Sequence, residues 1–204
     1  MAYPRKRKKG RNLSKVLLKY IFPSLLVFGM ILTTYGQNWY FDNGQGGKNW
    51  EIGKPIVNLK NAHNSASLFA IRQRALKLVN RDRKLNGLST LNADSLLSQA
   101  AQLHAEDMLK RNFYAHVTPE GKTPTDRFQA IGGKEGVGEN IMQQKENYGV
   151  RLTYGLAEKF QTSWMYSSGH RENILNPIYT HFGYGIAIDP LRGEVYAVQN
   201  FVTR

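Results

Sequence analysis

Residues able to carry acid–base or metal chemistry are few in this chain, and three of them stand where predicted elements begin or end. His116 lies in a polar segment after a predicted helix, Glu139 stands between Gly138 and Asn140 where a strand begins, and His170 comes directly after a helix. Binding and catalytic residues are found disproportionately in such positions. An imidazole or a carboxylate at such a position can take part in acid–base chemistry or bind a metal ion.

The same residues allow two other interpretations. Glu139 and His170 carry groups that can bond to each other and to the backbone, which would hold loops in place without binding anything. Ser167 or Ser168 beside His170 offers a nucleophile and a base by residue type. A catalytic triad is defined by geometry, however, and neighbours on one short turn give no reason for that geometry. His104 lies on an apolar helix stripe and is predicted to be a core histidine.

Helices come first along the folded part of the chain. Apolar residues recur at helical spacing over 68–79, after a serine cap at Ser65 or Ser67, and again after Asp94. A further long helix is predicted over about 153–166, and a short one after Thr123, with proline at its first position. Basic residues on the other face of the first helix predict a solvated surface, or alternatively a contact with anionic envelope polymer: Arg72, Arg74, Lys77, Arg81, Arg83 and Lys84.

The clear strands come last. One strand is predicted to open at Gly138, and the strands over 181–189 and 194–202 are joined by a hairpin loop. Helices followed by strands favour an α+β fold in which helices cover an antiparallel sheet. The chain has no cysteine, which excludes disulfides and cysteine-based zinc sites, so its core has to hold it together.

The basic residues are concentrated at the N-terminus. Removing the eight of positions 1–20 lowers the formal net charge from +13 to +5. An apolar run follows them directly, which favours a membrane address over a nucleic-acid-binding tail. Residues 1–15 are predicted to be a cytoplasmic tail or signal n-region, and 16–36 a single-pass signal-anchor or a signal peptide cleaved after Gly36. An aromatic-rich linker over 37–64 and a domain over 65–204 complete the predicted organisation.

Six segments in order resemble the CAP superfamily of cysteine-rich secretory, antigen 5 and pathogenesis-related proteins, especially its cysteine-free bacterial branch. Gly-Glu-Asn-Ile over 138–141 and Gly-His-Arg-Glu-Asn-Ile-Leu over 169–175, the end of a longer matching segment Trp164–Leu175, are the most specific. The others are His104–Met108, Phe113–His116, Gly121–Arg127 and His181–Gly185.

The resemblance implies a three-layer α-β-α sandwich with a central cleft. In the family, two His and two Glu residues line this cleft, often with a divalent cation. By motif these positions are His116, Glu139 and His170, with Ser167 where the second Glu of animal and plant members stands. Ser167, Asn140 and His181 are expected as possible cleft neighbours. We therefore expect an exported protein that is either membrane-bound or released. Its cleft is expected to bind a small ligand, lipid, glycan or protein. The one candidate cofactor is weakly bound zinc or another divalent cation. The alternatives are a metal-dependent hydrolase using His116, Glu139 and His170, and a structural envelope-binding protein.

Overall fold

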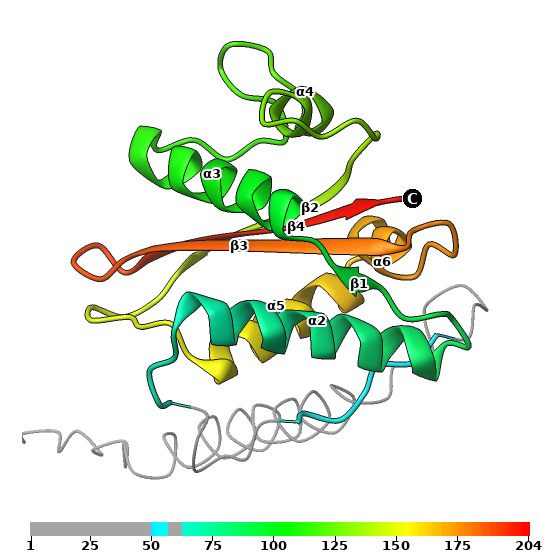
Figure 1. The fold of residues 1–204 in the computed structure, drawn as a ribbon. Helices are drawn as coiled ribbons and strands as arrows, with labels where there is room; N and C mark the ends of the chain where they lie inside the picture. The colour runs from blue at the N-terminus through cyan, green and yellow to red at the C-terminus, as the bar shows by residue number, and fades with distance from the viewer. Residues whose placement is uncertain (1–49, 57–62) are drawn as a thin grey trace, which may run out of the picture. The chain divides into compact units, whose positions relative to one another are not determined.

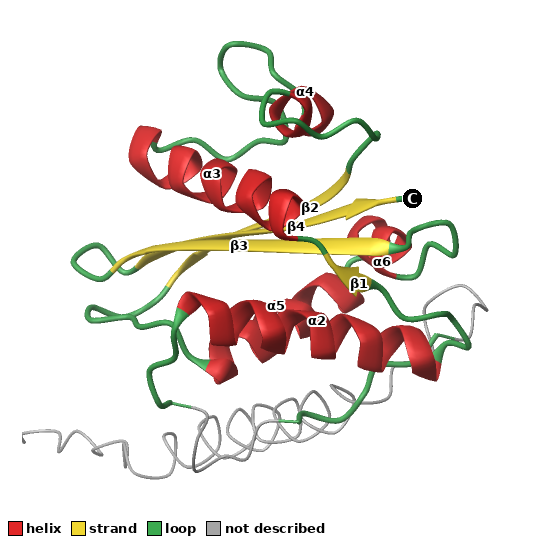
Figure 2. Cartoon of the chain, viewed as in Figure 1, coloured by secondary structure: helices red, strands yellow, loops and turns green. Residues whose placement is uncertain are grey.

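A four-stranded sheet forms the middle layer of the domain in the computed structural model, which describes residues 50–56 and 63–204 (Figures 1 and 2). The strand order is β1 (Asn92–Ala93), β3 (His181–Asp189), β4 (Glu194–Val202) and β2 (Gly138–Lys145). Strand β4 pairs antiparallel with both β3 and β2, whereas β1 pairs parallel with β3. The predicted sandwich is confirmed. The sheet is mixed rather than purely antiparallel, and the sequence did not predict this because the two-residue edge strand β1 is too short to show a periodicity.

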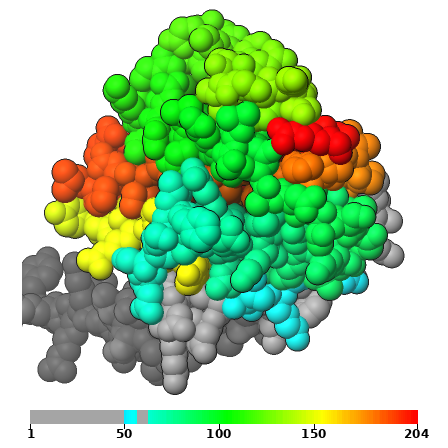
Figure 3. Space-filling model, in the orientation of Figure 1, coloured from blue at the N-terminus to red at the C-terminus, as the bar shows by residue number. Residues whose placement is uncertain are grey.

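Helices cover both faces of this sheet. Helices α3 (Ser95–Arg111) and α4 (Pro124–Gln129) lie on one side, and α2 (Leu68–Leu85) and α5 (Tyr154–Tyr166) lie on the other (Figure 1). The short helix α6 (Ser168–Ile174) follows α5 and packs against β2. In the space-filling view, side chains of the 95–130 region and those of 63–85 meet across the edge of the sheet (Figure 3).

Burial of both sheet faces explains why β3 and β4 are apolar without strict alternation. Eight consecutive residues of β4 are buried, as expected where helices cover both sides of a strand. Gly183 and Gly185 let α3 approach β3 closely. A Cβ at Gly185 would lie 2.3 Å from the carbonyl carbon of Ala101, and one at Gly183 would lie 2.4 Å from that of Leu97. These glycines set the spacing between the α3 layer and the sheet.

The predicted helix starts are confirmed by their caps. The side chains of Ser67, Asp94 and Thr153 each accept a hydrogen bond from a backbone N–H in the first turn of α2, α3 and α5. Thr123 and Asp126 form a reciprocal capping box at α4, with Pro124 at the first helical position. These local contacts fix where α4 begins, and α4 carries a residue that proves central to the site.

The basic face predicted for α2 is only partly solvated. Arg83 is fully buried and donates to four backbone carbonyls, those of Ser89, Ile174, Asn176 and Tyr179. Burial lowers the pKa of this guanidinium. The expectation of a solvated face was therefore wrong for Arg83, because spacing alone cannot show that a loop wraps around a cation.

Residues 50–56, predicted as linker, pack on the domain. Trp50 and Ile52 are 6% and 5% exposed and belong to the core between the sheet and the α2–α5 layer. The guanidinium carbon of Arg171 lies 4.1 Å from the ring centre of Trp50. The backbone N–H of Gly53 donates to Asp82 Oδ1 at 2.9 Å. We refer to residues 50–56 as the strap. Trp50 of the predicted linker therefore packs on the domain.

The remaining predictions for the N-terminal part lie outside the described residues. These are the basic tail over 1–15, the apolar segment over 16–36 and the parts of the linker at 37–49 and 57–62. Across 50–56 and 63–204, no helix combines the length and apolarity that crossing a membrane requires.

Candidate functional site

Glu139 is the centre of a polar cluster at the start of β2. It pairs with Asn200 of β4 and is 7% exposed. Its Oε1 lies 2.9 Å from His116 Nδ1, and its Oε2 accepts from Arg127 Nη2 at 2.6 Å. A buried carboxylate is stable only with such partners. The sequence-predicted pair of His116 and Glu139 is thus in direct contact.

Arg127 is the residue that sequence reasoning missed. Placed on α4 by the capping box, it also donates from Nη1 to the carbonyl oxygens of His116 at 2.7 Å and Lys122 at 3.1 Å. One guanidinium therefore joins the buried carboxylate to the loop that carries His116. The residue lay inside the recognised segment 121–127, but nothing in the spacing indicated that its partner would be a carboxylate on β2.

The bond to Glu139 defines what His116 can offer a ligand. Its side chain is 50% exposed. In the neutral imidazole, an Nδ1–H that donates to the carboxylate leaves Nε2 as an acceptor. A half-exposed acceptor of fixed orientation suits a ligand that carries a hydroxyl or an amide N–H.

His104 lies beneath the cluster, in the core, as predicted. It is 1% exposed, and its Nε2 lies 3.0 Å from the carbonyl oxygen of Ala115 and 3.9 Å from Glu139 Oε1. Its Nδ1 has no hydrogen-bond partner among the described residues. Burial lowers the pKa of His104, which favours the neutral ring.

His170 comes from α6 rather than from a loop. Burial, and then the neighbouring charge of His116, lower the pKa of its imidazole. The backbone carbonyl of His170 accepts a hydrogen bond from Asn140, the residue after Glu139, so α6 lies against the start of β2. The Nδ1 of His170 is buried without a hydrogen-bond partner in the described part of the chain. The structure thus brings His116, Glu139 and His170 into one region, with only His116 bonded to the carboxylate.

The three expected neighbours have different places. Asn140 is fully buried and donates to the carbonyl oxygen of His170 at 3.0 Å. Ser167 joins α5 to α6, and its side chain makes no capping hydrogen bond. The imidazole of His181 contacts the hydroxyl of Thr180, with Nδ1 2.8 Å from that oxygen. Of these neighbours, Asn140 is the one bonded to the site.

The residues as placed do not fit a metal ion. A guanidinium already lies against Glu139 Oε2, and His116 turns Nδ1 toward Oε1. A divalent cation would meet the positive charge of Arg127 and have to displace it. In agreement, no three His, Asp or Glu side chains of the described ranges are grouped so that they could hold a metal. The zinc site implied by the resemblance stays a prediction.

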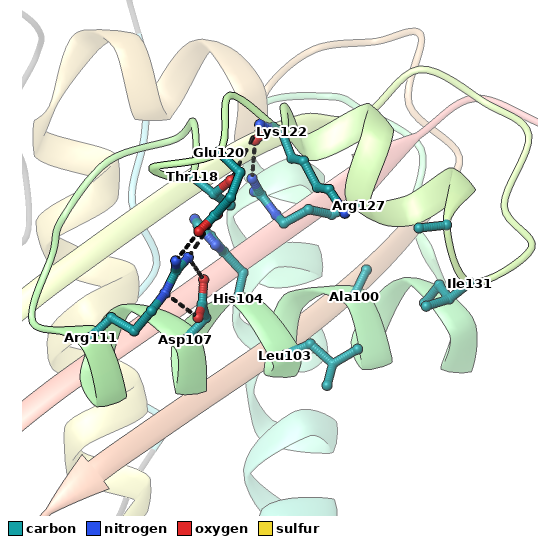
Figure 4. A pocket seen from close by; sticks show the side chains of 11 residues that line it. Ala100, Leu103, His104, Asp107, Arg111, Thr118, Glu120, Lys122, Arg127 and Ile131 are labelled. Carbon is teal, nitrogen blue, oxygen red and sulfur yellow. Dashed lines mark hydrogen bonds and ion pairs between the residues drawn. The ribbon is translucent and has the colours of Figure 1, made fainter.

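A groove of about 520 Å³ lies beside this cluster. Helix α3 forms one wall, and the 118–122 loop with α4 forms the other (Figure 4). At one end Arg111 is paired with Asp107 and Glu120, while Ala100 and Ile131 line the other end (Figure 4). The groove shares Arg127 and His104 with the cluster and is not lined by His116, Glu139 or His170.

This fold is that of a CAP domain. The model of the cysteine-rich secretory protein family, CAP, matches residues 76–201, and the chain belongs to that family. The recognised resemblance is confirmed, and the chain has no cysteine.

Two relatives come from Bacillus subtilis strain 168. The chain is 33% identical over 121 residues to the uncharacterized protein YkwD, a match that covers 59% of this chain and 44% of YkwD. It is 33% identical over 129 residues to the uncharacterized membrane protein YlbC, covering 63% of this chain and 33% of YlbC. The chain therefore spans less than half the length of these two curated relatives.

Solved structures agree on the fold. An extracellular SCP-domain protein of Bacillus anthracis is 28% identical with a TM-score of 0.54, over 74% of this chain and 45% of that one. An outer surface protein of Borrelia burgdorferi is 17% identical with a TM-score of 0.58, over 70% of this chain and 98% of that one. At that identity the second similarity shows the fold alone.

Proposed function

We propose that this chain is an exported CAP-domain protein that binds a ligand at the cell envelope or outside the cell, over His116 and His170. Export is supported by the basic and apolar N-terminal sequence. It is also supported by a structural relative described as extracellular and a sequence relative described as a membrane protein. In this proposal the ligand carries hydroxyl or amide N–H groups, as glycans and peptides do.

The observation that carries the proposal is the state of Glu139. A general base or a metal ligand has to present a carboxylate oxygen to a water or a cation. Both oxygens of Glu139 already accept hydrogen bonds, from Arg127 at 2.6 Å and from His116 at 2.9 Å. The carboxylate therefore serves to orient His116, and the accessible group is the imidazole. Recognition by a fixed acceptor fits this arrangement better than hydrolysis by a free carboxylate.

Ligand titration followed by NMR tests the binding site. Chitooligosaccharides and short peptides, titrated into the full chain in detergent micelles, should shift the ring resonances of His116 and His170, and the saturable shift of the His170 ring should be lost in His116→Ala. His63→Ala is the matched control, because His63 is an exposed histidine remote in sequence from the cluster. Equal binding by both variants, or saturable shifts confined to residues outside the cluster, would contradict the site.

The hydrolase alternative keeps one supporting observation. A carboxylate that fixes an imidazole through Nδ1 is the arrangement by which hydrolases orient a catalytic histidine. Peptidase and glycosidase activity that disappears in Glu139→Gln, with the fold intact by circular dichroism, would favour this alternative. Retained ligand binding without turnover would favour the binding module.

The fate of the N-terminus is tested separately. Cleavage after Gly36 predicts an exported protein whose intact mass begins at Gln37, whereas a signal-anchor predicts a full-length chain in the membrane fraction.

The third alternative, an envelope contact through the basic face of α2, retains fewer free cations than the sequence suggested. Arg83 is buried, and Arg72 donates to the carbonyl oxygens of Tyr184 and Ser98. Lys77 and Lys84 are the exposed lysines of this helix. Binding to anionic polymer that falls steeply with salt, and falls further in a Lys77→Ala/Lys84→Ala variant, would support it.

A further inference from the structure

A row of buried polar side chains runs from α2 to the candidate site. Asp82 on α2, Gln161 on α5, Gln199 on β4 and Asn140 on β2 are each at most 1% exposed. Buried polar groups are costly unless they are hydrogen-bonded. Asp82 continues the apolar stripe of α2, four residues after Leu78 and seven after Ala75, so a carboxylate at this depth calls for a physical reason.

The hydrogen bonds along this row all run in one direction. Gln161 Nε2 donates to Asp82 Oδ2 at 2.7 Å, and Gln199 Nε2 donates to Gln161 Oε1 at 2.9 Å. Asn140 Nδ2 then donates to Gln199 Oε1 at 3.1 Å. Each amide of the row thus turns its nitrogen toward Asp82.

This common direction follows from the chemistry of the first member. An ionised carboxylate only accepts hydrogen bonds, whereas an amide has one accepting and one donating end. Asp82 is paired with Arg81, whose Nε lies 2.8 Å from Oδ1. Gln161 therefore has to present its NH₂ group to Asp82, which leaves its oxygen for Gln199, and the same reasoning carries the orientation on to Asn140.

The last amide of the row holds the backbone of the site. Asn140 Nδ2 also donates to the carbonyl oxygen of His170 at 3.0 Å. Its Oδ1 accepts from Asn173 Nδ2 at 2.9 Å, and that same nitrogen donates to the carbonyl oxygen of Glu139 at 3.1 Å. With Asn140 reversed, its oxygen would face two acceptors and its nitrogen would face the donor of Asn173. The site backbone is therefore held correctly in only one orientation of Asn140.

We propose that Asp82 is a remote positioning residue of the candidate site, setting through Gln161 and Gln199 the orientation in which Asn140 ties His170 to Glu139. The proposal rests on the proposed function only in that it assigns a purpose to the site. The same carboxylate accepts from Gly53 N–H at 2.9 Å, so the strap and the site share one buried charge.

Three variants separate this positioning from general stabilisation. Asp82→Asn places an NH₂ group where only acceptors stood, so the row loses its fixed direction. Asp82→Asn/Gln161→Glu moves the carboxylate one position along the row, where it can again accept from Gln199 and restore the orientation of Gln199 and Asn140. Gln161→Met cuts the row while leaving Asp82 bonded to Arg81 and Gly53.

Asn80→Ala is the matched control on the same helix. Asn80 makes two hydrogen bonds with the backbone of Leu91, at 2.9 and 2.7 Å, and none with the row. The Asn80→Ala variant therefore removes two partly buried hydrogen bonds from α2 without touching the orientation of the amides.

Hydrogen exchange by mass spectrometry on the full chain gives the readout, with α3 as internal reference. Asp82→Asn and Gln161→Met should speed exchange in peptides covering α6 and the start of β2 by about tenfold relative to α3, the loss expected for one or two buried hydrogen bonds. The double variant should return α6 close to the wild-type rate. Asn80→Ala should change α6 and α3 alike.

Two results would overturn the proposal: an α6 unaffected by Gln161→Met, or a double variant no better than Asp82→Asn. Should Asp82→Asn fail to fold, the Gln161→Met result decides alone. Because exchange is measured without a ligand, its failure leaves the proposed function standing, and a failed ligand titration leaves the positioning result standing.

Discussion

The ion pair between Arg127 and Glu139 is the contact on which the candidate site most depends. The side chains are 12% and 2% exposed, and Nη2 and Oε2 lie 2.6 Å apart. Arg127→Met keeps most of the side-chain volume and removes the charge, so that Glu139 is left with His116 as its charged or polar partner on the loop side. The perturbation therefore tests whether a buried carboxylate at this position needs a counter-charge.

The expected cost follows from the burial of the pair. Removing one partner of a buried ion pair costs roughly 3–5 kcal/mol, because an uncompensated charge stays behind. The carbonyl oxygens of His116 and Lys122 also lose their donor, but these bonds are at the surface, where water replaces it. For a domain of this size the loss corresponds to a fall in Tm of roughly 6–20 °C. Arg127→Lys keeps the charge but not the paired donors of the guanidinium, so its free energy of unfolding should lie between those of the wild type and Arg127→Met.

Urea unfolding at pH 7, followed by the fluorescence of the buried Trp50 and Trp164, measures this cost by linear extrapolation. The double variant Arg127→Met/Glu139→Gln is the control, and it should be more stable than Arg127→Met alone because no buried charge remains. The reasoning is refuted if Arg127→Met costs less than about 1 kcal/mol. It is refuted equally if the double variant loses as much as the two single variants together.

Three further outcomes are expected. Arg83→Met should lower the free energy of unfolding by about 3–5 kcal/mol, since four carbonyl oxygens lose a charged donor; urea unfolding checks this, and a loss below about 1 kcal/mol would mean that water substitutes for the guanidinium. Burial lowers the pKa of both His104 and His170, so the unfolded chain takes up protons first as the pH falls below about 6.5. Stability should therefore be full above that pH and fall by at most about 1.4 kcal/mol per pH unit for each histidine, down to the folded pKa. Urea midpoints between pH 7 and 5 test this, and His104→Gln should flatten the profile; a midpoint that rises as the pH falls would contradict the sign. Calorimetric titration with Zn²⁺ should show binding no tighter than a millimolar Kd, because the ion has to displace a guanidinium from Glu139. Micromolar binding that is lost in His116→Ala/His170→Ala would instead establish the metal site.

Local patterns predicted the elements well because their causes are local. The caps at Ser67, Asp94 and Thr153 act within one turn of the helices they begin, so the sequence around each is sufficient. Strand β1 and helix α6 were not predicted. Two residues have no period, and the seven residues of α6 follow α5 with Ser167 between them. The location of His170 on a helix follows from tertiary packing rather than from propensity.

The candidate site was predicted in its members but not in its contacts. The resemblance selected His116, Glu139 and His170, and the structure brings them together. Which cation compensates Glu139 depends on how α4 folds over β2, and residue 127 is 12 positions away in the chain. Similarly, the partners of Asp82 cannot be read from a helix stripe, because the amides of the row that begins at Asp82 come from α5, β4 and β2.

The strap has a consequence for the distance over which this protein can work. Because Trp50 and Ile52 are built into the core, at most the 13 residues 37–49 separate the predicted apolar segment from the folded domain. A chain of that length reaches roughly 45 Å when fully extended. An anchored domain could therefore bind ligands only within a short distance of the bilayer, whereas cleavage after Gly36 would free it to diffuse. The choice between the two N-terminal fates is thus also a choice of which ligands the domain can meet.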